Sequence, residues 1–249
     1  MERLAVVSCH VERPLDDECW RLFSALQERR PGGFRIAAFM RPPAPEAGED
    51  EGRWLERAHE AVQRGPFGHH THFVSPSHAR PPAPGPEHAE RVQREAAWLR
   101  GQGLTPTLFC GGGWYMDAGL AEAVAGLGYA DCTATAFTPS YLEPDAPRLS
   151  LAEPARLVLP GGARLLELPS THSLGAAARS AGGDVVHVYF HDADLLSARR
   201  RWALEVVLRL LGRRRRVSDL DELARIAADN APELAFSDVF RGGNGGSGQ

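Results

Sequence analysis

The sequence predicts an α/β protein whose parallel sheet closes, or nearly closes, into a barrel. Apolar strand-like runs alternate with helical patterns along the chain, which is typical of right-handed βαβ units. There are about seven such runs, enough for a small barrel, and a length of 249 residues fits one domain of this kind. Polar clusters follow several of the runs, and parallel barrels place their chemistry at the carboxyl ends of their strands.

The predicted strands are short runs rich in β-branched and aromatic residues. We expect them at residues 4–9, 34–40, 70–74, 107–110, 130–137, 164–168 and 185–191. Between them, apolar residues recur at helical spacing. We expect helices at residues 16–29, 51–63, 87–102, 117–127 and 198–211. Gly103 and Gly128 fit helix C-termini, and Ser218 with Asp221 resembles a capping box.

Proline and glycine mark the parts of the chain outside this pattern. Residues 42–45 and 81–86 are proline-rich and are expected to form stiff surface loops. The second loop follows a histidine cluster and is placed at the rim of a substrate cleft. We assign residues 1–240 to one barrel domain and residues 241–249 to a flexible glycine-rich tail.

The composition is that of an ordinary soluble globular protein, with 43% hydrophobic and 24% charged residues. A net charge of −4 argues against a general nucleic-acid-binding role. The arginine block at residues 213–216 is interpreted as the solvated end of a helix. All 28 basic residues are arginine, which excludes a lysine Schiff-base mechanism.

The chain shows no signal peptide and no stretch apolar enough to span a membrane. Its four cysteines form no CxxC pair, so we expect a cytoplasmic protein with reduced thiols. Cys9 and Cys110 end two predicted strands, and an alternative is that one of them binds zinc as a thiolate. The oligomeric state is not indicated.

Histidines gather in three clusters at the ends of apolar runs. In a strand, side chains two residues apart share a face, so each cluster would point one way. Burying so many titratable groups costs free energy unless they are paired or bind a metal. The sequence therefore predicts a shared metal or acid/base site. The clusters are His10 with Glu12, His70 with His72, and His187 with Tyr189 and His191.

The order of these motifs resembles the polysaccharide deacetylases of the NodB-homology type, carbohydrate esterase family 4. The motifs are SCHVE at 8–12, GHHTH at 68–72, FCGGGW at 109–114, LELPST at 166–171 and VYFHDADL at 188–195. The resemblance runs over residues 4–227 and implies a single-domain, distorted (β/α) barrel of seven strands. It also implies a divalent metal ion, with zinc favoured by the ligand types.

The resemblance implies roles for five residues. Glu12 matches the metal-ligand carboxylate, and His70 and His72 match the two histidine ligands. His10 stands where the family has its catalytic aspartate, and it is either the base or a further ligand. His191 matches the histidine that acts as general acid toward the leaving amine.

The third motif departs from the family, which carries an arginine in an R-x-P-x-G segment at this place. Here the glycines can supply backbone N–H groups to a ligand. We expect Gly112, Trp114, Tyr115 and Asp192 to bind substrate, the two aromatic rings by stacking on a sugar. Two alternatives are a tight turn with Trp114 in the core and a structural role for His187.

The function predicted from these residues is metal-dependent hydrolysis of a C–N bond. The substrate would be an N-acetylated sugar, small or oligomeric. The alternative is a catalytically degraded barrel that binds carbohydrate or acts as a scaffold, since two catalytic positions of the family are replaced. A hydrolase using Ser8 or Ser170 is disfavoured, because neither serine lies in a G-x-S-x-G elbow.

Overall fold

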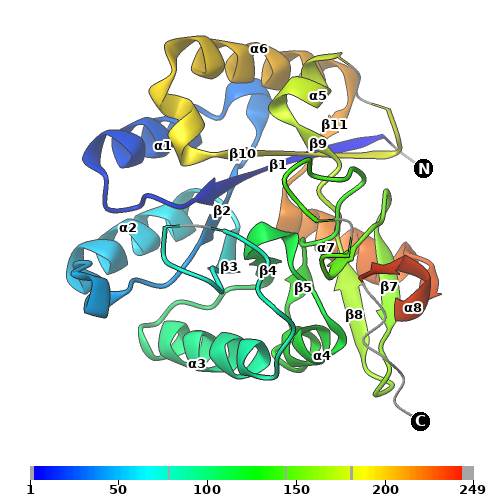
Figure 1. Ribbon diagram of the computed structural model, residues 1–249. Helices are drawn as coiled ribbons and strands as arrows, with labels where there is room; N and C mark the ends of the chain where they lie inside the picture. The colour runs from blue at the N-terminus through cyan, green and yellow to red at the C-terminus, as the bar shows by residue number, and fades with distance from the viewer. Residues whose placement is uncertain (1–2, 78, 144, 180–181, 243–249) are drawn as a thin grey trace.

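The computed structural model describes residues 3–77, 79–143, 145–179 and 182–242 (Figure 1). Its main sheet has the strand order β12-β7-β8-β5-β4-β3-β2-β1-β10-β9, with β11 paired to β1. All pairings are parallel except that of β7 with β8. The strands are β1 (Leu4–Val11), β2 (Ala37–Met40), β3 (Phe67–Thr71), β4 (Leu108–Gly111), β5 (Ala130–Asp131), β7 (Ala155–Val158), β8 (Arg164–Glu167), β9 (His172–Ser173), β10 (Val185–His191), β11 (Arg216–Val217) and β12 (Glu233–Ala235). A separate antiparallel pair joins β6 (Arg148–Leu149) to β13 (Phe240–Arg241).

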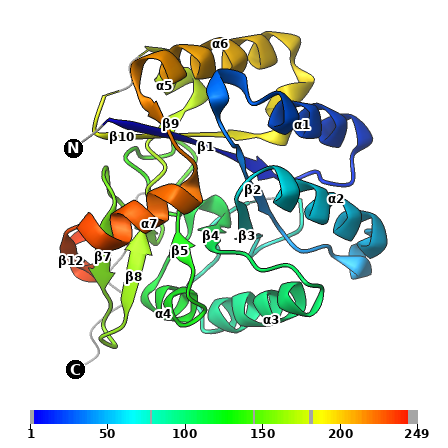
Figure 2. The ribbon, with the colours of Figure 1, turned by 180° about the vertical axis from the view of Figure 1, so that it is seen from behind.

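Helices cover the outside of this sheet, as the two opposite views in Figures 1 and 2 show. The α-helices are α1 (Asp17–Arg29), α2 (Glu51–Arg64), α3 (Glu87–Gly101), α4 (Ala118–Gly126), α5 (Leu174–Arg179), α6 (Ala198–Arg214), α7 (Leu220–Asn230) and α8 (Phe236–Val239). The 3-10 helices are η1 (Pro31–Gly33), η2 (Pro45–Ala47), η3 (Gly112–Trp114) and η4 (Asp192–Leu196). None of the helices in the described ranges is long and apolar enough to cross a membrane.

One segment, residues 164–173, brings the sheet back on itself. Its first part, β8, pairs with β5 at Asp131 and Glu167, and an isolated bridge joins Thr135 to Ser170. Its last part, β9, pairs with β10 at His172 and Val188. The chain therefore crosses from β8 to β9 at the far end of the sheet. The predicted α/β fold class with a mostly parallel sheet is confirmed, and within the described residues the hydrogen-bonded strand order stays open between β9 and β12.

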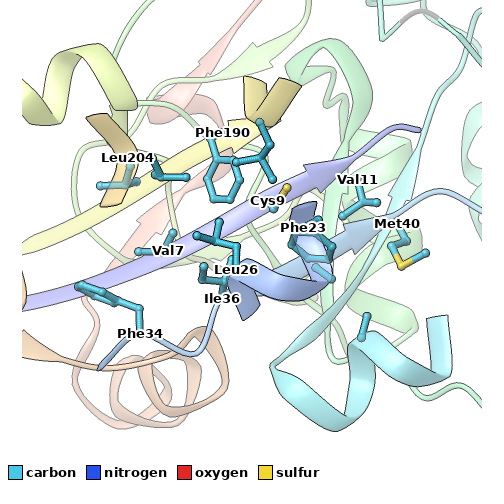
Figure 3. Close-up of a cluster of buried hydrophobic side chains, with 14 of the residues drawn as sticks. Val7, Cys9, Val11, Phe23, Leu26, Phe34, Ile36, Met40, Phe190 and Leu204 are labelled. Atoms are coloured by element: carbon cyan, nitrogen blue, oxygen red, sulfur yellow. The ribbon is translucent and has the colours of Figure 1, made fainter. Parts of the chain in front are cut away.

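The alternation of β1 separates core from site. Val7, Cys9 and Val11 belong to an apolar cluster with Phe23 of α1 and Leu204 of α6 (Figure 3). Ser8 and His10 belong to the other face of the strand, toward the interior of the barrel. Cys9 thus lies in the apolar layer under the helices, so the alternative that Cys9 binds zinc is wrong.

Two strand ends differ from the prediction. β3 begins at Phe67 and ends at Thr71, so His72 lies just past the strand. The strand predicted at 130–137 ends at Asp131, because side chains take the next backbone donors. Asp131 Oδ1 accepts from Thr133 N at 3.1 Å, and Glu167 Oε1 accepts from Ala134 N at 2.9 Å.

The helix prediction holds in place but not in every detail. α6 continues past Gly212 to Arg214, and it is capped by Ser197. The capping box predicted at Ser218 and Asp221 is wrong: Asp219 caps α7 and accepts from Glu222 N at 2.9 Å. In the predicted tail, residues 243–249 lie outside the described part of the chain.

Candidate metal centre and active site

The parallel register brings the histidine clusters together at one end of the barrel. β1 pairs with β10 so that His10 lies beside His191. β2 links β1 to β3, whose end carries His70 and His72. The ring centroid of His10 lies 4.9 Å from that of His70 and 5.2 Å from that of His191. The predicted clusters therefore meet in one site.

Glu12, His70 and His72 form one group of candidate ligands. Their ligand atoms all lie within 4.8 Å of one another. The Nε2 atoms of His70 and His72 are 3.1 Å apart, and His72 Nε2 is 3.6 Å from Glu12 Oε1. Both rings are buried, whereas the Glu12 side chain is 25% exposed, so the group opens toward solvent on the carboxylate side.

The outer nitrogens of these rings fix the tautomers. His70 Nδ1 lies 2.7 Å from the carbonyl oxygen of Cys110, and His72 Nδ1 lies 3.0 Å from that of Pro76. A carbonyl oxygen only accepts, so each Nδ1 carries the proton and donates it. In its neutral form, each ring then presents an Nε2 lone pair to the other. Metal-binding histidines have this arrangement, with the second nitrogen held by a backbone carbonyl.

The donor set fits a divalent ion. Two lone pairs face each other and a carboxylate, and they repel unless a positive charge lies between them. Tetrahedral zinc with Zn–N bonds of about 2.0–2.1 Å places two nitrogen ligands about 3.3 Å apart, close to the separation found here. The residues present therefore fit a metal such as zinc.

The charges of the group are also those that a metal requires. Burial would raise the pKa of Glu12, but the neighbouring imidazoles of His72, His191 and His70 outweigh it and lower this pKa to about 2. Burial, followed by the charge of His72, lowers the pKa of His70 to about 3. At neutral pH Glu12 is ionised and His70 is neutral, and metal ligands bind in these forms.

His10 lies deeper, at the centre of a ring of aromatic side chains. Its centroid is 5.4 Å from that of Trp114, and 5.7 Å from those of Phe39 and Tyr189. Burial and then the charge of His70 lower the pKa of His10 well below its usual value. His10 is therefore neutral, and it has a ring nitrogen available to accept a proton.

A second possible ligand set consists of His10, His70 and Cys110. Cys110 Sγ lies 3.8 Å from His10 Nε2. Burial, with the charges of Asp131 and Glu167, raises the pKa of the Cys110 thiol well above its usual value. A protonated thiol is a poor ligand, so the geometry and charge favour the set with Glu12.

The third motif packs tightly against the histidines. A Cβ on Gly112 would lie 2.6 Å from the carbonyl oxygen of Thr71 and 3.0 Å from Cδ2 of His72, so only glycine fits. Trp114, at a φ of 60°, is buried at 4% exposure in an apolar cluster, as the alternative of a tight turn with Trp114 in the core predicts, and its ring centroid lies 5.0 Å from that of Tyr189. Tyr115 is fully buried and donates to Asp117, so its predicted stacking on a sugar is wrong.

The two acids after β10 act on the backbone. Asp192 is buried, and its Oδ2 accepts from Arg13 N at 2.7 Å, which ties the end of β1 to the end of β10. Asp194 Oδ2 accepts from His191 N at 3.1 Å. Asp194, and not Asp192, is therefore the acid that contacts His191, and contact of Asp192 with substrate stays a prediction.

His191 is the most exposed of the clustered groups. Its side chain is 37% exposed, and its Nε2 lies 3.6 Å from Glu12 Oε1. A cavity of about 600 Å³ adjoins it, lined by Tyr189, Asp194 and Arg199 among others. This cavity is large enough to hold a ring the size of a sugar residue next to His191.

His187 has the structural role that was one of the alternatives. Its Nε2 lies 2.8 Å from Ser8 Oγ, its Nδ1 lies 3.2 Å from the carbonyl oxygen of Pro169, and both side chains are fully buried. A substrate does not reach this serine–histidine pair. Ser170 is buried too, which leaves the serine-hydrolase alternative without an accessible nucleophile.

Sequence reasoning missed two features. Phe137 stacks on Tyr189 at 5.7 Å with an interplanar angle of 10°, and together with Trp114 they form an aromatic wall beside His10. The second feature is a buried pair of acids, Asp131 and Glu167. In the sequence, each member of this pair is an acidic residue within an apolar strand-like run, and that is the signal by which it could have been found.

Comparisons with known proteins support the fold. No family model matches the sequence, and no curated protein matches it. A 4-α-glucanotransferase from Thermococcus litoralis superposes with a TM-score of 0.60 and 11% identity over 94% of this chain. A family 4 carbohydrate esterase pseudoenzyme from Bacillus anthracis superposes with a TM-score of 0.57 and 11% identity, also over 94% of this chain. A mutant of that pseudoenzyme with restored enzymatic activity gives a TM-score of 0.56.

The chain spans 42% of the glucanotransferase and 67% of the pseudoenzyme. Identities this low show the fold alone. The fold inferred from the order of the sequence motifs is thus similar to that of a family 4 carbohydrate esterase pseudoenzyme.

Proposed function

We propose that this protein is a metal-dependent hydrolase that removes the acetyl group from an N-acetylated sugar. One observation supports this above all: the lone pairs of His70 Nε2 and His72 Nε2 converge 3.1 Å apart beside the ionised carboxylate of Glu12. Three such ligands leave coordination positions for water and substrate. A bound divalent ion would acidify that water and polarise the acyl oxygen.

His10 and His191 are assigned the proton transfers. His10 is neutral and lies at the base of the site, where it accepts the proton of the attacking water. His191 presents Nε2 on the open side, where it gives a proton to the departing nitrogen. The two rings are in edge-to-face contact, with their centroids 5.2 Å apart, so both border the same site.

The substrate class follows from the walls of the site. Phe137 and Tyr189 are half-buried aromatic residues near His10, with Trp114 packed behind them, and flat apolar faces of this kind suit the carbon face of a sugar ring. The proteins with similar folds also support a carbohydrate, since they include a glucanotransferase and a family 4 carbohydrate esterase pseudoenzyme.

The test is acetate release from a panel of N-acetylated mono- and oligosaccharides. The protein is stripped with a chelator and then refilled with zinc, cobalt or manganese. The proposal expects turnover only in the refilled protein and only with an intact Glu12. Glu12→Gln keeps the shape of the side chain but removes its charge, so it should lose both metal and activity.

A catalytically degraded, carbohydrate-binding protein is the second candidate. It is supported by the buried environment of His10, since a histidine whose pKa is strongly lowered is a weak base. Binding of an N-acetylated oligosaccharide by calorimetry, without acetate release under any metal condition, would favour this candidate over the hydrolase.

A further inference from the structure

Among the residues that the structure describes, the outer face of α6 carries an apolar ridge whose side chains are partly or largely exposed. Trp202 is 69% exposed and Leu210 is 42% exposed, with the half-buried Val206 between them. These three residues are spaced four apart, so they share one face of the helix. The opposite face is buried in the core through Leu204, Val207, Leu208 and Leu211. Figures 1 and 2 show α6 at the outer edge of the molecule.

Positive charge frames this ridge. Arg199 and Arg213 lie seven residues before and after Val206, so they fall on the same face as the ridge. Within the described residues, the side chains of Arg199, Arg213 and Arg214 form no ion pair or hydrogen bond, and all three are exposed. Residues 199–216 hold one acid, Glu205, and eight arginines, Arg199, Arg200, Arg201, Arg209, Arg213, Arg214, Arg215 and Arg216.

A groove beside the ridge is lined by both apolar side chains and arginines. It has a volume of about 410 Å³ and is lined by Trp202, Val206 and Leu210 together with Arg3, Arg179 and Arg214, among others. Ala178 and Ala203 line both this groove and the cavity beside His191, so the two adjoin along α5 and α6.

The chemistry of the face selects its partner. The whole chain carries a net charge of −4, so the positive face is a local feature and not a consequence of general basicity. A basic helix with tryptophan and leucine on the same face is typical of proteins that lie on anionic bilayers. The apolar side chains enter the acyl boundary, while arginines bind lipid phosphates.

We propose that the outer face of α6 docks on a membrane surface rich in anionic phospholipids. The ridge of Trp202, Val206 and Leu210 enters the interface, and Arg199, Arg213 and Arg214 contact the headgroup phosphates. The cavity beside His191 would then lie near the bilayer, where it could receive substrates from the membrane surface. This docking is independent of the hydrolytic chemistry proposed above.

The test is sedimentation of the full-length protein with vesicles of phosphatidylcholine alone or with added phosphatidylglycerol. We expect binding only to the anionic vesicles, and we expect it to weaken with salt. Arg199→Gln with Arg213→Gln and Arg214→Gln should weaken binding about a hundredfold, at about fivefold for each arginine. Trp202→Ala with Leu210→Ala should also weaken it, without any change in charge.

The matched control is Arg21→Gln with Arg94→Gln and Arg225→Gln, three exposed arginines on other helices with the same total charge change. It should bind vesicles nearly as wild type does. Circular dichroism checks that all variants fold. Absence of binding to anionic vesicles, or equal loss in the patch and control variants, would overturn the proposal. Two other results would also overturn it. One is vesicle binding that survives Trp202→Ala with Leu210→Ala and is matched by binding to duplex DNA. The other is a dimer in sedimentation velocity that depends on the ridge and does not bind vesicles.

Discussion

Two groups of titratable side chains are buried in this barrel, and the free-energy cost of burying each group is offset in a different way. Glu12, His70 and His72 converge at the open end, with unshared lone pairs facing one another. Asp131 and Glu167 face each other from paired positions of β5 and β8, and both are fully buried. The first group has an opening to solvent, whereas the second has none.

We expect the acid pair to share a proton. Asp131 Oδ1 accepts from the hydroxyl of Thr133 at 2.6 Å, and Glu167 Oε1 accepts from Ala134 N. Within the described residues, the other two oxygens, Asp131 Oδ2 and Glu167 Oε2, find no donor. Burial raises the pKa of Asp131 to about 6, and burial with the charge of Asp131 raises that of Glu167. One proton between the two carboxyls satisfies both.

Crowding of titratable groups is therefore not enough to identify a site. In the acid pair, a proton completes the hydrogen bonds and no ligand can enter. In the histidine group, both outer nitrogens are already used as donors, and the inner lone pairs open toward the exposed side of Glu12. Direction and access distinguish a metal centre from a structural pair.

The largest effect is expected from removing a ligand. His70→Ala or His72→Ala should abolish the binding of about one divalent ion per chain, because two ligands no longer enclose it. Elemental analysis of protein purified without a histidine tag measures this. The matched control is His69→Gln on the same strand, since His69 faces away and bonds Glu95 at 2.9 Å. Equal metal content in all of these variants would show that His70 and His72 do not bind a metal ion.

The next effect separates a base from a ligand. His10→Ala should keep the metal and reduce turnover about a hundredfold to ten-thousandfold, because it removes the proton acceptor. Metal content and acetate release are measured on the same preparation. If both are lost, His10 belongs to the ligand set with His70 and Cys110.

A selective effect is expected at the opposite side of the site. His191→Ala should slow the release of acetate from an amide about a hundredfold, with little change for an activated aryl ester, whose leaving group needs no proton. Metal content should be unchanged. An equal loss of rate on both substrates would show that His191 is not the general acid.

The smallest predicted effect concerns the acid pair, and it is a gain in stability where the other predictions are losses. A raised folded-state pKa means that each carboxyl's contribution is full below its unfolded value, 3.8 for Asp131 and 4.5 for Glu167, and is lost as pH rises through its folded-state value, which is about 6 for Asp131. Glu167→Gln keeps a donor toward Asp131 and needs no proton. It should therefore be more stable than wild type by about 1–3 kcal/mol near pH 8, with the gain shrinking toward about pH 4.

Urea unfolding at the two pH values checks this prediction. Glu233→Gln is the control, because Glu233 is an exposed acid whose pKa is lowered by its hydrogen bond with Arg164. Destabilisation of Glu167→Gln at both pH values would show that the two carboxyls do not share a proton.

Much of the fold could be predicted from the sequence because its strands are apolar runs of constant period. The alternation in β1 gave both the apolar layer of Val7 and Cys9 and the inward position of His10. β9 could not be predicted, because two residues, His172 and Ser173, form a strand only through their pairing with β10. The end of β5 at Asp131 depends on Glu167, which is remote in sequence.

The candidate site was also predicted only in part from the sequence. Spacing placed His70 with His72, and order along the chain placed them near Glu12 and His191. The role of Tyr115 was predicted wrongly because its neighbour Asp117 accepts its hydroxyl and holds the ring in the core. Nothing local distinguishes Tyr115 from Trp114, whose left-handed backbone lets its ring reach His10.

The central claim is that His70, His72 and Glu12 hold a metal ion, and anomalous diffraction from a zinc-soaked crystal tests it most directly. The account predicts one strong peak between the two Nε2 atoms and a Glu12 carboxylate oxygen, at about 2.0–2.2 Å from each. It predicts no zinc bond to His191. A peak bonded to Cys110 and His10, or no peak at this end of the barrel, would contradict the account.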